Sequence, residues 1–169
     1  IPAATVLLLR DAPSFEVLMI ERHADIGFAG GALVFPGGRV DPGDRDPAWT
    51  EHATGLIDDM AFAQVAAARE TFEEVGILLA RRRGEETLID AARAAALSPL
   101  HKLVENDDAL FLKMMHEEKL TLACETLRLF AHWVAPPGMH KRFDTLFFAA
   151  ACPRGQAPLE DGDEATEAL

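Results

Sequence analysis

The sequence predicts an α/β protein, and three observations support that class. An aliphatic and β-branched run at residues 5–10 indicates a strand. Apolar residues recur at helical spacing over residues 61–79, and two more apolar runs, at residues 127–134 and 143–151, indicate later strands. A length of 169 residues with 49% apolar content suits one domain with a full core, so residues 1–169 are expected to form a single domain.

The first strand is expected to begin a hairpin. Asp, Pro and Ser mark a turn at residues 11–14, and residues 15–21 form the second strand. A loop at residues 23–31 and a short strand at residues 32–35 follow. Residues 36–46 are rich in Pro, Gly and Asp, so we expect a loop without regular structure there.

The central helix follows a segment that carries acidic residues at its end. Asp58 and Asp59 suit a helix N-terminus, where carboxylates meet free amides and the positive end of the dipole. Gly76 is placed to end the regular helix or to allow close packing, after which residues 77–80 can continue as a strand. Residues 81–84 are most simply a solvated turn.

Two helices are expected in the second half of the chain, at residues 87–96 and 99–119, because Ala, Leu, Lys and Glu recur at three- and four-residue spacing. The apolar side chains of the second helix suit a buried core and, as the alternative, a homodimer contact; these are Leu110, Phe111, Met114 and Met115. The last two strands are joined by a turn at residues 136–139.

Residues 69–77 carry the chemistry. At about 100° per residue, Glu70, Glu73 and Glu74 project within one sector of the helix. Like charges at this spacing destabilise a helix, and a divalent cation would offset that cost. Clustered carboxylates suit Mg²⁺ or Mn²⁺, which take their remaining ligands from water and from a bound phosphate. The alternative is a solvated acidic face in which Arg69 pairs with Glu73.

A glycine-rich segment lies upstream of this helix. Gly37 and Gly38 follow an apolar run and a proline, and adjacent glycines let a backbone carbonyl come close to a ligand or an ion. The carbonyl of Gly38 is therefore a further candidate ligand.

Together these segments resemble the Nudix box of the Nudix hydrolases, G-x5-E-x7-R-E-U-x-E-E-x-G-U, where U is bulky and aliphatic. Gly38 and the Arg69 to Ile77 stretch match the pattern. Three departures are visible. Asp44 stands at the first glutamate, Thr71 stands at the first U position, and residues 45–68 separate the two halves as an insertion. A long surface loop adds only about 0.6 kcal/mol of closure entropy per doubling of its length, so the acidic face can survive the insertion.

An interrupted box of this kind resembles one branch, the coenzyme A diphosphatases of the nucleoside diphosphate-linked moiety X motif nineteen type. Residues 22–38, 132–136 and 142–148 look like further segments of that branch. The resemblance implies the Nudix α/β/α sandwich with a mixed β-sheet, and it implies that residues 87–119 are a helical insert that lids the substrate groove or makes a dimer contact.

The resemblance also assigns roles to residues. The metal ligands would be Glu70, Glu73, Glu74 and the Gly38 carbonyl. Glu73 is alternatively the base, Arg69 would orient the carboxylates, and Glu164 in the acidic tail is a base outside the box. The candidate substrate-binding cations are Arg22, Arg39 and Arg142.

The implied reaction is Mg²⁺- or Mn²⁺-dependent hydrolysis of a diphosphate linkage. Coenzyme A or acyl-coenzyme A would give 3′,5′-ADP and phosphopantetheine or its acyl form. Two alternatives stay open, namely a Nudix pyrophosphatase for ADP-ribose, nucleotide sugars or dinucleoside polyphosphates, and a Nudix nucleotide-sensing module without turnover.

Composition sets limits on partners. A net charge of −12 disfavours binding of long nucleic acids, which requires a basic stripe. No run of the sequence approaches the roughly 18 apolar residues of a membrane span. Two widely spaced cysteines, Cys124 and Cys152, favour a reducing compartment, and a cytoplasmic location is expected.

Overall fold

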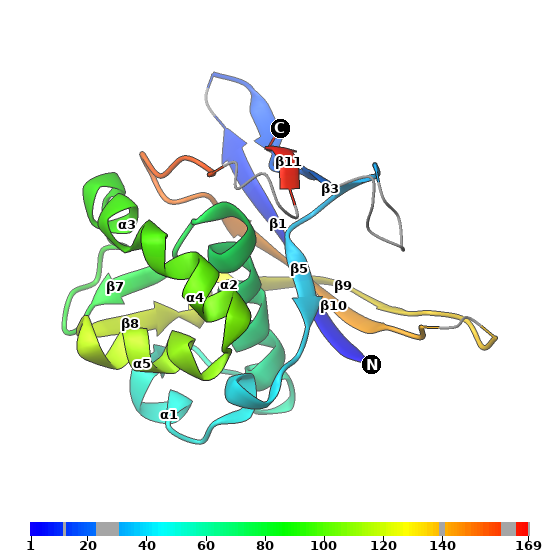
Figure 1. Ribbon diagram of the computed structural model, residues 1–169, viewed down its shortest axis with the longest axis horizontal. Coiled ribbons are helices and arrows are strands. Elements are labelled where there is room, and N and C mark those ends of the chain that lie inside the picture. Colours follow the sequence, from blue (N-terminus) through cyan, green and yellow to red (C-terminus); the bar gives the residue numbers. More distant parts are fainter. Residues whose placement is uncertain (12, 23–30, 139–140, 160–164, 169) are drawn as a thin grey trace.

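The computed structural model describes residues 1–11, 13–22, 31–138, 141–159 and 165–168. Within them, three sheets and a set of helices are arranged in layers (Figure 1). The strands are β1 Pro2–Asp11, β2 Phe15–Val17, β3 Ile20–Arg22, β4 Leu33–Val34, β5 Gly37–Arg39, β6 Ala53–Thr54, β7 Ala80–Arg82, β8 Leu120–Ala123, β9 Arg128–Val134, β10 Asp144–Ala151 and β11 Ala165–Ala168. The α-helices are α1 Trp49–His52, α2 Ala61–Val75, α3 Ala91–Leu97, α4 His101–Asn106 and α5 Ala109–Glu117. The 3-10 helices are η1 Pro42–Arg45, η2 Asp58–Met60, η3 Ser98–Leu100 and η4 Cys124–Thr126.

The largest sheet is mixed, as expected. Its order is β2-β1-β10-β9, with β5 also paired to β1. Strand β1 runs parallel to β10 and antiparallel to β2 and β5, and β10 runs antiparallel to β9. Two three-stranded sheets, β11-β3-β4 and β6-β8-β7, complete the strand pairing.

Helix α2 lies between two apolar cores, with the large sheet on one side and α3, α4, α5 and β8 on the other (Figure 1). Three of its alanines, Ala63, Ala66 and Ala67, lie in the core on the sheet side together with Val6 of β1. Phe72 faces the opposite core, where its ring stacks against Phe111 of α5 with the centroids 6.1 Å apart. Small residues on the sheet side let the backbone of α2 approach the strands closely, which positions its polar residues against β5.

Several expected elements are confirmed. The β1–β2 hairpin, the short strand β4, and the pair β9 and β10 all form. Gly76 ends α2 in a left-handed conformation, with φ of 67°. The acidic pair Asp58 and Asp59 lies in η2, immediately before α2. Phe111, Met114 and Met115 are buried in the core, and Leu110 is partly buried against it.

Three expectations are wrong in the first half of the chain. Residues 15–21 do not form one strand, because β2 and β3 pair in different sheets. Residues 36–46 contain regular structure, since Gly37–Arg39 pairs with β1 and Pro42–Arg45 forms η1. The N–H of Asp41, the residue before η1, donates to Asp44 Oδ2 at 2.8 Å. Residues 77–79 do not form a strand, and β7 begins only at Ala80.

The second half shows three further differences. Residues 81 and 82 belong to β7 and are not a solvated turn, since Arg81 pairs with Glu125. Residues 99–119 form η3, α4 and α5 and not one helix, because the chain breaks at Asp107 and Asp108. Strand β8 was not expected; Lys119, with φ of 53°, turns the chain from α5 into it. Among the described residues, no helix has the length and apolar character needed to cross a membrane.

Candidate active site

The candidate site lies where the C-terminal half of α2 meets β5. A Cβ atom added to Gly38 would lie 2.5 Å from Glu70 Cδ, so the glycine leaves the space that the Glu70 carboxylate fills. The backbone N–H of Gly37 donates to Glu74 Oε2 at 2.8 Å. Two adjacent glycines therefore bring β5 directly against two of the three carboxylates, as the sequence predicted.

Arg69 is the centre of the site. Its side chain is only 2% exposed, and its Nε and Nη2 donate to the two carboxylate oxygens of Asp44 at 2.8 and 3.0 Å. Nη1 donates to Glu73 Oε1 at 2.9 Å, and Nη2 lies 3.0 Å from Glu70 Oε1. One buried guanidinium thus contacts three carboxylates closely, and a fourth, that of Asp41, lies 3.6 Å from Nη2. A planar fork of five donors allows this geometry.

Asp44 stands where the Nudix pattern has glutamate, and it is almost fully buried. Although residues 45–68 intervene in sequence, the structure joins the two halves of the box through the bidentate Asp44–Arg69 pair. Arg69 also donates to the carbonyl of Arg39 at 3.0 Å, which ties the loop after β5 to α2. The insertion leaves the acidic face intact, and the shorter aspartate is compatible with the arginine contact.

Burial raises the pKa of two glutamates at this site. The pKa of Glu70 is raised to about 8, mainly by desolvation, with Arg69 opposing the shift and Glu73 adding to it. Burial likewise raises the pKa of Glu73 to about 7, with Arg69 opposing the shift and Asp44 and Glu105 adding to it. Burial also raises the pKa of Asp44, against the opposing effect of Arg69. Three buried carboxylates, those of Asp44, Glu70 and Glu73, therefore share one arginine, and desolvation is the main cause of their raised pKa values.

The donor set fits a hard divalent cation in its chemistry. Glu70, Glu73 and Glu74 offer carboxylate oxygens, and the negative charge that Arg69 leaves uncompensated favours a cation. In their present positions, Glu70 and Glu73 contact Arg69, and Glu74 accepts from Gly37. Among the described residues, no group of three or more His, Cys, Asp or Glu side chains is arranged to hold a metal ion. The ligand roles of these residues, and of the Gly38 carbonyl, stay predictions.

The other predicted residues are more dispersed. Arg39 is exposed and pairs with Asp41 at 2.7 Å. Arg142 is also exposed, and its Nε donates to the carbonyl of Ala135 at 2.8 Å. Both lie at one end of the large sheet, since Ala3 of β1 pairs with Arg39 and with Thr145 of β10. Arg22 is the last residue of β3, and Glu164 lies outside the described residues.

Two neighbours of the site were not expected. His101, the first residue of α4, makes a 2.9 Å hydrogen bond through Nδ1 to the carbonyl of Glu73. Arg45 places its guanidinium over the ring of Phe62, 4.2 Å from the centroid, beside the Asp44 end of the cluster. No sequence signal indicates the first contact, because His101 and Glu73 belong to segments whose meeting depends on the packing of α4 against α2.

Comparison with solved structures defines the class of protein. The chain is similar to a Nudix hydrolase from Alicyclobacillus acidocaldarius, with a TM-score of 0.76 and 30% sequence identity over 99% of this chain and 77% of that one. A MutT Nudix hydrolase from Burkholderia pseudomallei shares the fold, with a TM-score of 0.52, 15% identity, and coverage of 99% and 79%. The Nudix α/β fold predicted from the sequence is confirmed.

Within that class, residues 50–168 match the NUDT19 Nudix domain, and the chain belongs to this family. The predicted Nudix resemblance and its branch are therefore confirmed. Curated relatives include the human acyl-coenzyme A diphosphatase NUDT19, which is 28% identical over 88% of this chain, and the Xenopus laevis protein of that name, 26% identical over 90%. This chain spans about half the length of these relatives, 50% and 51% respectively.

Proposed function

We propose that this chain hydrolyses the diphosphate linkage of coenzyme A or acyl-coenzyme A, in a reaction that depends on Mg²⁺ or Mn²⁺, to give 3′,5′-ADP and phosphopantetheine or its acyl form. Two similar curated proteins are named acyl-coenzyme A diphosphatases, which supports the substrate class. The observation that carries the proposal is the Arg69 cluster held against Gly37 and Gly38. It gathers more buried carboxylate charge than one arginine offsets.

In this proposal Glu70, Glu73, Glu74 and the Gly38 carbonyl would hold the cation. A bound Mg²⁺ or Mn²⁺ supplies charge neutralisation on the phosphate oxygens and a more acidic water. Arg69 acts as a positioning residue, because its contacts fix the rotamers of Glu70 and Glu73 relative to Asp44.

The remaining roles concern the proton and the substrate. Glu73 or Glu164 takes the proton of the attacking water. The guanidinium groups of Arg22, Arg39 and Arg142 bind the phosphates of the substrate. Exposure of Arg39 and Arg142 at one end of the large sheet supports this assignment.

We further propose that residues 1–169 act as one catalytic domain, with residues 45–68 and 87–119 as insertions. The second insertion contacts the catalytic helix directly, because His101 binds the Glu73 carbonyl. Through that contact, a movement of α4 would displace the backbone of Glu73.

Product analysis tests the proposal. The protein is incubated with Mg²⁺ or Mn²⁺ and a panel of coenzyme A, acyl-coenzyme A, ADP-ribose, NADH and diadenosine polyphosphates, and the products are separated by chromatography. We expect release of 3′,5′-ADP with the highest kcat/KM for coenzyme A species. Preferred cleavage of another substrate would keep diphosphate hydrolysis and reject coenzyme A, and no turnover would favour a nucleotide-binding module.

Two variants complete the test. Glu74→Gln keeps the size of a side chain at the β5 contact and removes its charge, so kcat should fall at least about 100-fold. Glu51→Gln makes the same change at an exposed position on α1 and should leave kcat unchanged. Full activity of Glu74→Gln would remove this carboxylate from the reaction.

A further inference from the structure

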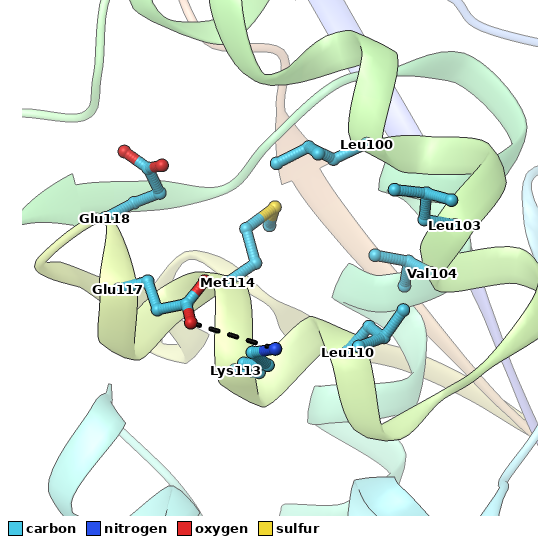
Figure 2. A pocket seen from close by; sticks show the side chains of 8 residues that line it. All are labelled: Leu100, Leu103, Val104, Leu110, Lys113, Met114, Glu117 and Glu118. Atoms are coloured by element: carbon cyan, nitrogen blue, oxygen red, sulfur yellow. Dashed lines mark ion pairs between the residues drawn. The ribbon is translucent and has the colours of Figure 1, made fainter.

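An apolar groove lies between η3, α4 and α5, in the predicted insert (Figure 2). Leu100 and Leu103 form one wall, Leu110 forms the facing wall, and the side chains of Val104 and Met114 close the groove from the core side. Leu103 is 54% exposed, so part of the apolar lining of the groove is open to solvent. An exposed apolar wall of this kind points to a ligand that covers it.

The groove is connected to the candidate active site through α4. His101 directly follows Leu100 and binds the Glu73 carbonyl, so the helical turn that begins the groove also touches the catalytic helix. Helix α4 also packs directly against α2. One side of α4 therefore faces the acidic cluster, and the other side forms the groove wall.

The charges at the groove rim favour a neutral ligand. Lys113 and Glu117 form an ion pair, with Nζ 3.8 Å from Oε1 (Figure 2). Glu118 pairs with Arg93. These pairs leave an apolar floor bordered by carboxylates whose charge is balanced by their partners. Burying a ligand carboxylate on this apolar floor would cost free energy, whereas a hydrocarbon chain would bury Leu103 without an electrostatic cost.

We propose that this groove binds the fatty acyl chain of acyl-coenzyme A, an inference that rests on the proposed function. The acyl group is attached to the thiol at the far end of the pantetheine arm, so its site must be separated from the diphosphate by the length of that arm. The groove lies on the side of α4 that faces away from Glu73, apart from the acidic cluster. The acyl chain carries no charge, which suits the apolar lining of the groove.

The test compares substrates in one variant. Leu103→Gln replaces an exposed apolar wall residue, so the fold should be retained. We expect kcat/KM for decanoyl-coenzyme A to fall about tenfold while the value for coenzyme A stays unchanged. Leu129→Gln is the matched control, because Leu129 is 49% exposed and lies on β9, away from the groove. Equal losses for both substrates in Leu103→Gln would overturn the proposal.

A second measurement does not depend on turnover. Calorimetric titration with S-decanoyl-pantetheine, which lacks the diphosphate, should show saturable binding to the wild type and to Leu129→Gln, and weaker binding to Leu103→Gln. The analogue with a terminal carboxylate on its chain should bind more weakly than the decanoyl probe. No saturable binding to the wild type would overturn the groove assignment, whereas binding without hydrolysis of any coenzyme A species would reject only the proposed reaction.

Discussion

In the proposed metal-binding role, the single side chain of Glu70 serves the site at the expense of the fold. Its carboxylate is enclosed by Gly38 and shares Arg69 with Asp44 and Glu73. If Glu70 lost its charge, Arg69 would still be compensated by the other two carboxylates. The buried charge of Glu70 is therefore a cost to the metal-free fold, as expected of residues that are kept for function.

Stability of the metal-free protein should depend on pH for this reason. A carboxyl whose pKa is about 8 in the folded protein and 4.5 in the unfolded chain takes up a proton on folding. The contribution of this carboxyl to the free energy of unfolding is largest below pH 4.5 and is lost as the pH rises toward 8. Each unit of pKa difference between the folded and unfolded states corresponds to about 1.4 kcal/mol. Urea denaturation in EDTA at pH 5 to 8 should show this decline in the free energy of unfolding.

The same experiment on Glu70→Gln should give a flatter pH profile and a protein more stable than the wild type at pH 8, although its activity is lost. Glu117→Gln, on the exposed face of α5, is the control and should follow the wild-type profile. A Glu70→Gln protein less stable than the wild type at pH 8 would show that the carboxylate stabilises the fold.

At the scale of elements, the site depends on how closely β5 approaches α2. Gly38 pairs with Ala4 of β1, and its missing side chain provides the room for Glu70. Gly38 is not among the described residues with positive φ, so its importance is one of space and not of backbone conformation.

Gly38→Ala should therefore act through Glu70. The added methyl group would displace the carboxylate, and we expect a loss of activity of at least about tenfold with about 1 to 3 kcal/mol of destabilisation. The control is Gly43→Ala in η1, where a Cβ would lie 2.9 Å from Asp108 and no site carboxylate is crowded. Steady-state kinetics and urea denaturation of both variants separate the loss of activity from the loss of stability. Comparable kcat values for Gly38→Ala and the wild type would contradict the role of this close approach.

At the scale of the whole molecule, the acidic site belongs to a protein with a net charge of −12. Helix α2, which holds the acidic cluster, is buried between two cores, so a ligand that stabilises this helix should stabilise the whole fold. A cation that binds only the folded protein raises its stability by mass action.

Mg²⁺ should therefore raise the melting temperature. At about 100 times its Kd the gain is about 2.7 kcal/mol, which corresponds to roughly 5 to 10 °C for a chain of this size. Differential scanning calorimetry at constant ionic strength, with Na⁺ as the comparison, measures the gain. An equal gain with Na⁺, or an undiminished gain in the Glu74→Gln variant, would show screening of the overall charge and not binding at the site.

The local features of this protein were predictable from its sequence. Helical spacing alone places Glu70, Glu73 and Glu74 in one sector, and Gly37 with Gly38 indicates a close backbone approach. Strands β1, β9 and β10 were predicted because long apolar runs carry a strong periodic signal. Short elements gave less signal: β8 has four residues, and the break between α4 and α5 lies in an otherwise helical pattern.

The sequence by itself therefore determined the fold class, the family resemblance and the acidic face of α2, because each depends on residues close together in the chain. Only the tertiary structure decided that Asp44 reaches Arg69 across residues 45–68, that β5 pairs with β1, and that His101 binds the Glu73 carbonyl. These contacts join distant segments, and their formation depends on packing around α2, which no local pattern specifies.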